Sequence, residues 1–227
     1  MAYELYYWDG IQGRGEFVRL ALEEACADYI DITRQPGRGT SAMIDVMESE
    51  SEPHIPFAPP FLKDGDLIIP HVANILFYLG PKLGLAPEDE GLRHVINGLQ
   101  LTVTDFVAEV HDTHHPIDTS LYYQDQKPEA KARSAAFIRE RIPKFLGYFE
   151  RVLRQNPKGR NHIVGDALTY AFPKAMANRK AEYPALLALH DAVAKRPNIA
   201  RYLASPRRLA FNEEGIFRHY PELDGAG

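Results

Sequence analysis

The sequence predicts a small α/β domain followed by an all-helical domain. Residues 1–82 read as strand, helix and strand, followed by a hairpin and another helix, which is the order of a mixed α/β unit. Beyond residue 90 no convincing strand pattern occurs, whereas apolar residues recur at helical spacing. We therefore expect two domains, at residues 1–82 and 90–227, joined by a stretch rich in glycine and proline.

The first domain is expected to open with a strand at Glu4–Trp8 and a turn at Asp9–Gly13. A helix should follow from Arg14, because apolar residues then recur every three or four positions. Tyr29–Ile32 is expected to form a second strand, and Thr40–Met47 a short helix.

A hairpin is the clearest local signal in this domain. Pro59-Pro60 opens a short apolar run, Asp64-Gly65 follows as the turn, and a second apolar run ends at Pro70. Asp-Gly between apolar runs is a strong hairpin cue, and proline is allowed at the start of a strand or in a cis peptide bond. Apolar residues at 72, 75, 76 and 79 then predict a helix that begins after His71 and ends at Gly80.

The second domain is expected to contain four helices. Leu92–Asp112 keeps one face apolar, and Pro128–Gln155 has the same pattern, with a kink expected at Pro143. Two shorter helices are predicted at Ala185–Lys195 and Ile199–Leu203, each after a turn that contains proline.

The composition excludes several classes of function. The chain has 227 residues, is 45% hydrophobic and 25% charged, and carries a net charge of −5, so no nucleic-acid partner is expected. No apolar run approaches the roughly 18 residues of a membrane span, and the N-terminus has no signal-peptide pattern. Cys26 is the single cysteine and is expected to fill the core. We expect a reduced, cytoplasmic protein.

Six motifs, taken in order, resemble those of the cytosolic glutathione transferases. They are Tyr7-Trp8, Gly13-Arg14, Pro60-x-Leu62-x-Asp64-Gly65, Ile163-Val164-Gly165-Asp166, Tyr183-Pro184 and Arg196-Pro197. The resemblance covers nearly the whole chain and is to the tyrosine-type mu, pi and sigma proteins, with a bacterial character; Tyr7-Trp8 is most similar to the mu class. It implies a thioredoxin-like domain that binds glutathione and a helical bundle that shapes the pocket for a small hydrophobic electrophile. Glutathione would be the co-substrate without a metal, and the protein would be a homodimer active in detoxification.

The resemblance makes Tyr7 the candidate catalytic residue. A thiol with a pKa of about 8.5 is only slightly ionised at neutral pH, and a hydrogen bond donated to the sulfur favours the thiolate. A tyrosine hydroxyl can donate that bond while it stays protonated. The turn has one more residue than the family pattern, however, so an ungapped count places Trp8 in the position of the tyrosine.

The resemblance also implies a set of residues that hold glutathione, namely Trp8, Arg14, Ala58, Pro59, Pro60, His71 and Val72. Either Pro59 or Pro60 could be the cis residue: the spacing to Asp64-Gly65 favours Pro60, whereas the need for a main-chain N–H favours Pro59. His71-Val72 stands where the family has Gln-Ser. We therefore expect weaker or altered glutathione binding, with the N-terminus of the following helix still offering N–H groups.

The electrophile pocket is expected to include Gln12, His111 and His115. Although His114 lies between these histidines, no metal site is predicted, because acidic or cysteine ligands are missing and Pro116 interrupts the helical spacing. Two other functions remain open. One is a binding protein with a degenerate glutathione site, and the other is a glutathione-dependent peroxidase, lyase or isomerase.

One helix of the family pattern is shortened in the carboxy-terminal half. Thr169 could begin a capping box, but Phe172 occupies its acidic position and Pro173 follows. The central helix is shorter than in the family by about three turns. Because the loss of a core helix would open a large cavity, we predict that residues are missing from this sequence around Tyr170-Ala171.

Overall fold

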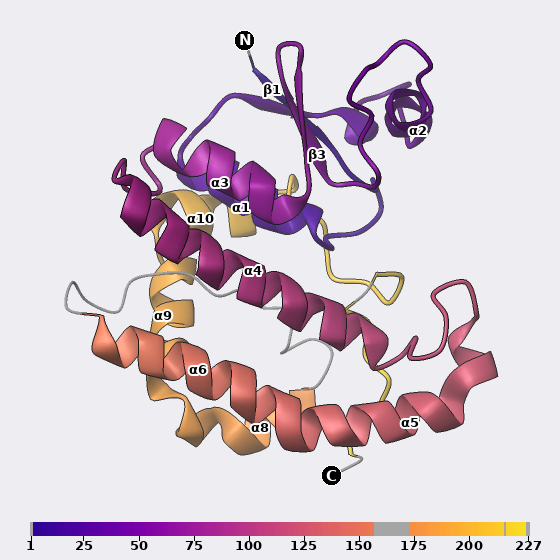
Figure 1. Cartoon of the computed structure of the whole chain (residues 1–227), viewed down its shortest axis with the longest axis vertical. Coiled ribbons are helices and arrows are strands. Elements are labelled where there is room, and N and C mark those ends of the chain that lie inside the picture. The colour runs from indigo at the N-terminus through magenta and orange to yellow at the C-terminus, as the bar shows by residue number, and fades with distance from the viewer. Residues whose placement is uncertain (1, 157–172, 216, 226–227) are drawn as a thin grey trace. The chain divides into compact units, whose positions relative to one another are not determined.

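The computed structural model describes residues 2–156, 173–215 and 217–225 (Figure 1). The chain separates into two compact units. The first contains residues 1–101 and 196–211, and the second contains residues 102–195 and 212–227. All the strands of the described residues lie in the first unit, so the predicted combination of an α/β part and a helical part is confirmed.

The first unit is built on a four-stranded sheet with the order β2-β1-β3-β4. Its strands are β1 (Tyr3–Tyr6), β2 (Tyr29–Asp31), β3 (Phe61–Asp64) and β4 (Leu67–Pro70). β1 is parallel to β2 and antiparallel to β3, and β3 and β4 form the predicted hairpin. Gly65 has a φ of 61° in its turn, a conformation that glycine adopts without steric cost.

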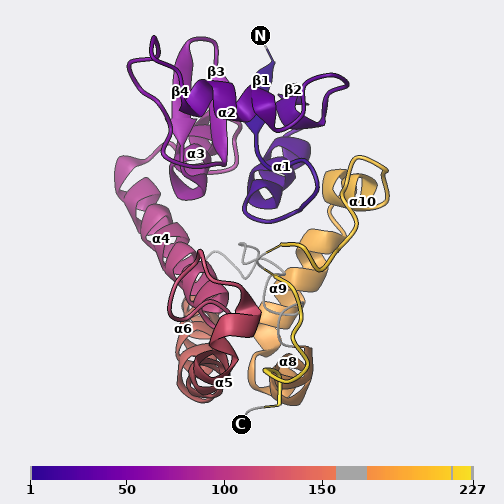
Figure 2. The ribbon, with the colours of Figure 1, turned by 90° about the vertical axis from the view of Figure 1, so that its right-hand side faces the viewer.

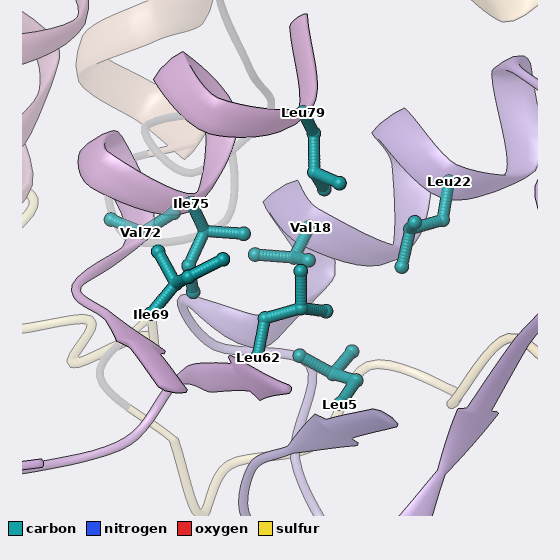
Figure 3. Packing of buried hydrophobic residues seen from close by; sticks show 8 residues of the cluster. All are labelled: Leu5, Val18, Leu22, Leu62, Ile69, Val72, Ile75 and Leu79. Atoms are coloured by element: carbon teal, nitrogen blue, oxygen red, sulfur yellow. The ribbon is translucent and has the colours of Figure 1, made fainter. Parts of the chain in front are cut away.

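Helices cover both faces of this sheet. α1 (Gly15–Glu24) and α3 (Val72–Lys82) pack against each other and against one face. The other face carries α2 (Ser41–Met47), whose Met43 packs with Tyr6 and Phe61. Figure 3 shows the core beneath α1 and α3, where side chains from three strands and two helices point toward one another; they are Leu5, Val18, Leu22, Leu62, Ile69, Val72, Ile75 and Leu79. This core fixes the end of β1 relative to the starts of α1 and α3.

Some details of the first unit differ from the sequence-based prediction. The first strand ends at Tyr6 rather than at Trp8, and Ile32 begins a 3₁₀ turn (Ile32–Arg34) instead of ending the second strand. Gly80 does not end α3, which continues through Pro81 to Lys82. The left-handed conformation that commonly ends a helix is adopted by Gly84, with a φ of 68°. Cys26 does not fill the core: it is exposed, and its φ of 50° places it in the left-handed region just beyond α1.

The remaining elements are helical (Figure 2). They are α4 (Glu90–Asp112), a 3₁₀ turn (Tyr123–Gln126), α5 (Lys127–Ala136), α6 (Ile142–Gln155), α8 (Pro173–Arg179), a further 3₁₀ turn (Lys180–Glu182), α9 (Pro184–Ala194) and α10 (Pro197–Leu203). α10 belongs to the first unit, and α4 begins in the first unit and ends in the second. The predicted helices at 92–112, 185–195 and 199–203 are confirmed. None of the described helices is both long enough and apolar enough to cross a membrane.

The long helix predicted over residues 128–155 is interrupted. A π-helical turn at Phe137–Arg141 separates α5 from α6, and Pro143 lies in the first turn of α6. Proline has no N–H to donate to the preceding turn and its ring crowds the carbonyl four residues back. A wider turn just before Pro143 accommodates both effects, which is the physical reason for the break.

Two buried carboxylates cap helices of the second unit. Glu150 of α6 accepts hydrogen bonds from the N–H groups of Ala185 and Leu186 at the start of α9, at 3.0–3.1 Å. Asp224 accepts from the N–H groups of Lys174 and Ala175 at the start of α8, at 2.8 and 3.0 Å. Each carboxylate satisfies donors that the helix itself leaves unpaired.

Part of the predicted pattern falls outside the described residues. This applies to Ile163-Val164-Gly165-Asp166, to Thr169 and Phe172 at the incomplete capping box, and to the segment predicted to be missing at Tyr170-Ala171. These expectations stay predictions.

Candidate active site

Tyr7 lies immediately after β1 and is almost completely buried, with 3% of its surface exposed. Its phenolic oxygen accepts a hydrogen bond from the main-chain N–H of Arg14 at 2.9 Å. Its main-chain carbonyl accepts from the hydroxyl of Thr33 at 2.5 Å. The phenol accepts this bond through an oxygen lone pair, so the bond does not use its own O–H, which can donate to a further acceptor.

The Tyr7 phenol is protonated at neutral pH. Burial raises its pKa above the ordinary value, while the N–H of Arg14 and the charges of Arg14 and Arg19 act in the opposite direction. A protonated hydroxyl with a raised pKa donates a hydrogen bond rather than acting as a base. The residue therefore fits the role of a donor to a bound thiolate.

Two glycines leave room for the Tyr7 ring. A Cβ atom added to Gly15 would lie 2.5 Å from Cδ1 of Tyr7, and a Cβ atom on Gly13 would overlap its hydroxyl. Gly13 also has a φ of 45°, which residues with a Cβ rarely adopt. The sequence Gly13-Arg14-Gly15 thus brings the main-chain N–H of Arg14 next to the phenol, and the tight packing explains why glycine stands on both sides of Arg14.

An open, polar hollow of about 580 Å³ lies in the same unit. It is lined by Asp9, Gly10, Thr33, Arg34, Gln35, Gly37 and Gly39. Thr33 connects this hollow to Tyr7 through its hydrogen bond with the Tyr7 carbonyl. Trp8, the residue next to Tyr7, is 40% exposed. The chain therefore reaches the surface directly after the buried Tyr7, and the next residues, Asp9 and Gly10, line the hollow.

The second group of candidate residues lies at the β3–β4 hairpin. The peptide bond between Pro59 and Pro60 is cis, so Pro60 is the cis residue, and Pro59 supplies a carbonyl but no N–H. Pro60 also accepts a hydrogen bond from the N–H of His71 at 3.1 Å. The neighbouring Ala58 is exposed.

His71 caps α3. Its Nδ1 accepts a hydrogen bond from the N–H of Ala73 at 3.3 Å. Its backbone has a φ of 71° and a ψ of 126°, an unusual conformation for a residue with a Cβ, which costs about 1–3 kcal/mol. Val72 instead packs in the core beneath α3, so only its main-chain groups can face a ligand.

The residues predicted for the electrophile pocket are distributed over both units. Gln12 lies in the first unit, where its side-chain amide donates to the carbonyl of Leu209 at 2.5 Å. His111 and His115 lie in the second unit. Their rings are stacked with centroids 5.2 Å apart, and burial together with the charges of His111 and Arg218 lowers the pKa of His115. A pocket shared by these residues stays a prediction.

Within the described residues no group of His, Cys, Asp or Glu side chains is arranged to hold a metal. The three neighbouring histidines contact one another instead. Nδ1 of His114 lies 2.6 Å from Nδ1 of His115, and the ring of His114 also lies against that of Tyr220, with centroids 5.5 Å apart.

The sequence-based prediction did not include a buried charge cluster next to Tyr7. Arg19 is fully buried, and its Nε donates to Asp31 at 2.7 Å. Its guanidinium carbon lies 5.9 Å from the centroid of the Tyr7 ring. The sequence did contain one signal for this cluster. Glu16 and Arg19 are three residues apart in α1, so they lie close together on the helix face that also carries the buried Val18.

Comparisons with known proteins find similarity to glutathione S-transferases. A family model described as "Glutathione S-transferase, C-terminal domain" matches residues 111–171 and 172–206. The two matched ranges meet between residues 171 and 172, directly after Tyr170-Ala171, where the sequence analysis predicts a missing segment.

Relatives named as glutathione S-transferases match over most of the chain. A glutathione S-transferase of Plasmodium falciparum is 26% identical over 91% of this chain and 97% of its own length. Glutathione S-transferase 2 of Onchocerca volvulus is 28% identical over 89% of this chain and 92% of its own length. Glutathione S-transferase P 1 of Xenopus laevis is 27% identical over 66% of this chain and 69% of its own length.

Two solved structures share the fold. The pi-class glutathione S-transferase of Onchocerca volvulus superimposes with a TM-score of 0.62, at 23% identity over 89% of this chain and 92% of that protein. The prostaglandin synthase D of Nilaparvata lugens superimposes with a TM-score of 0.63, at 17% identity over 91% of this chain and 98% of that protein.

Proposed function

We propose that this chain is a cytosolic glutathione S-transferase of the tyrosine type, grouped with the mu, pi and sigma classes. It conjugates the thiolate of glutathione to small hydrophobic electrophiles, which is the chemistry of detoxification. One observation carries the assignment: a buried, protonated phenol accepts an N–H bond from Arg14 and keeps its own O–H for the sulfur. The named relatives, which match over most of the chain, support it.

In the proposed reaction the O–H of Tyr7 donates to the sulfur of bound glutathione. The thiol loses its proton to solvent, and the resulting thiolate is stabilised by this hydrogen bond. The thiolate then attacks an electrophilic carbon, forming a C–S bond as the leaving group departs with the electron pair of its bond. Tyr7 keeps its proton throughout, so it stabilises the anion rather than acting as a base.

We propose that the first domain, residues 1–82, binds glutathione. Trp8 and Arg14 lie beside Tyr7, and Pro60 and His71 are joined by a hydrogen bond at the hairpin. The Pro59 carbonyl and the N–H groups at the start of α3, including that of Val72, offer main-chain contacts; Ala58 flanks them. Residues 90–227, with His111 and His115, together with Gln12, would form the electrophile pocket.

The function is tested by conjugation of an activated aryl chloride and by retention on immobilised glutathione. We expect the wild-type protein to be retained and to release chloride only when glutathione is present. Retention without conjugation would instead favour a binding protein with a degenerate site. That alternative has a structural basis, since Pro59 offers no N–H and the Val72 side chain is buried in the core.

We also propose that the protein is a cytoplasmic homodimer. Phe57 is 97% exposed, although burial of a phenylalanine side chain is worth about 1.5–3 kcal/mol. In the same unit, an apolar groove of about 480 Å³ is lined by residues of β4 and α3, among them Leu67, Phe77 and Tyr78. A second copy of the chain would supply the surface that covers such groups.

Phe57→Ser is expected to weaken this dimer by at least about tenfold, because it removes an apolar anchor worth roughly 1.5–3 kcal/mol. Sedimentation velocity over a dilution series would measure the change. Tyr122→Ser is the matched control, since Tyr122 is also strongly exposed, at 80%, but lies in the second unit. A wild-type protein that sediments as a monomer would contradict the proposal.

A further inference from the structure

The segment of residues 196–211, called the arm below, belongs to the same compact unit as Tyr7. Its helix α10 packs against α1 (Figure 1). Three arginines of the arm pair with three glutamates of α1; the pairs are Arg196 with Glu24, Arg207 with Glu23, and Arg208 with Glu16. The arm is thus attached along the whole length of α1.

A buried arginine connects this helix to the candidate active site. NH1 of Arg19 lies 3.4 Å from Oε2 of Glu16 and 3.4 Å from the main-chain carbonyl of Gln12. Its Nε donates to Asp31 at 2.7 Å, and the guanidinium lies against the Tyr7 ring. Arg19 therefore holds the turn that leads to Gly13-Arg14 and places a positive charge next to the phenol.

The arm reaches this cluster through Tyr202, a fully buried residue of α10. Its hydroxyl donates to Oε2 of Glu16 at 3.1 Å, the same oxygen that faces Arg19. Burial raises the pKa of Tyr202, so the hydroxyl remains a donor. The arm also contacts the turn directly at Leu209, whose carbonyl accepts a hydrogen bond from the Gln12 side chain. Gln12 is thus held on one side by Arg19 and on the other by the arm.

The cluster is costly for the fold. Within the described residues, NH2 of Arg19 and Oδ1 of Asp31 are buried without a hydrogen-bond partner, and Oε1 of Glu16 has only its ion pair with Nε of Arg208 at 3.5 Å. Each unsatisfied buried group costs about 1–3 kcal/mol, and an apolar cluster of the same volume would often be at least as stable. Such a cost is common where charge is needed for function.

We propose that Tyr202 is a positioning residue for Tyr7 and acts through Glu16 and Arg19. This inference rests on the proposed function. Without the Tyr202 hydroxyl, the Glu16 carboxylate has one donor fewer and attracts Arg19 more strongly. The guanidinium then moves away from the Gln12 carbonyl and from the Tyr7 ring, so the phenol becomes a weaker hydrogen-bond donor to the sulfur.

The test compares Tyr202→Phe with Arg196→Gln. The first removes only the hydroxyl, and the second removes an attachment of the same arm that has no contact with Glu16 in the structure. We measure the pH profile of kcat/KM, the thiolate absorbance of bound glutathione, and the KM for glutathione. Tyr202→Phe should raise the pKa of the bound thiol by about 0.5–1 unit, which lowers kcat/KM about threefold to tenfold below that pKa, with little change in KM. Arg196→Gln should match the wild type.

Two further variants separate positioning from a structural role. In a Tyr7→Phe background, Tyr202→Phe should cause no further shift of the thiol pKa, because the two residues act in series. Arg208→Gln, which weakens the hold on the same carboxylate from a partly exposed position, should raise the thiol pKa in the same direction; it keeps the test decisive if Tyr202→Phe does not fold. A Tyr202→Phe profile equal to that of the wild type, or additive shifts in the double variant, would overturn the proposal. An inactive wild-type protein would instead refute the proposed function.

Discussion

Tyr7→Phe is expected to lower kcat/KM for glutathione conjugation by about tenfold to a hundredfold. The substitution removes the O–H that would donate to the sulfur, and a hydrogen bond to a charged group is worth about 1.5–3 kcal/mol. The loss affects the thiolate more than the thiol, so the pKa of bound glutathione should rise by about 1–2 units. The activity at neutral pH should fall accordingly and partly recover as the pH is raised. The pH profile of kcat/KM measures both effects.

Tyr6→Phe is the matched control for this experiment. Tyr6 precedes Tyr7 in sequence but points to the other face of the sheet, where its ring stacks on Phe61 with centroids 4.5 Å apart. Its hydroxyl donates to Glu4 at 2.8 Å and has no contact with Tyr7 in the structure. The activity of Tyr6→Phe should therefore stay close to that of the wild type. Equal losses in both variants would show that a general loss of the fold, rather than the missing donor, explains the effect.

The sequence predicted the elements of residues 1–82 well because their signals are local. Asp64-Gly65 between two apolar runs determines the β3–β4 hairpin, and its apolar alternation matches the pairing of Leu62 with Ile69. Gly80 was misread as the end of α3, because a glycine that stays right-handed and one that adopts a positive φ look the same in sequence. Which glycine ends the helix depends on the path of the following chain, and here that glycine is Gly84.

The candidate site was predicted only in part, for a different reason. Tyr7 and Arg14 belong to one short segment, so a motif can connect them. Arg19, Asp31 and Tyr202 meet through tertiary packing, and sequence spacing carries no information about a contact between residues 16 and 202. Likewise, the cap that His71 forms on α3 depends on its backbone angles, which the residue type alone does not determine. The structure is therefore needed to show which residues support Tyr7 and how His71 caps α3.

Gly15→Ala is expected to lower the activity more than tenfold while the fold is retained. The added Cβ would lie 2.5–2.9 Å from Cδ1, Cγ and Cβ of Tyr7, so the ring must move or α1 must shift. Such overpacking costs about 1–3 kcal/mol, and a displacement of even 1 Å at a reacting group can cost about a hundredfold in rate. The conformation of residue 15 itself is not the cause, because Gly15 is not among the glycines with positive φ. Thermal unfolding and conjugation kinetics, measured on the same preparation, separate the two effects.

Gly98→Ala provides the comparison, because Gly98 lies inside α4 and a Cβ there would have no neighbour within 4 Å. Alanine is favoured over glycine in a helix by about 1 kcal/mol, so this variant should be as stable as the wild type or slightly more stable, with unchanged activity. The same chemical change thus has opposite consequences at two helical glycines, and the difference is the Tyr7 ring. Full activity of Gly15→Ala would contradict the proposed role of Tyr7, because the phenol could then leave its observed position without any effect on the reaction.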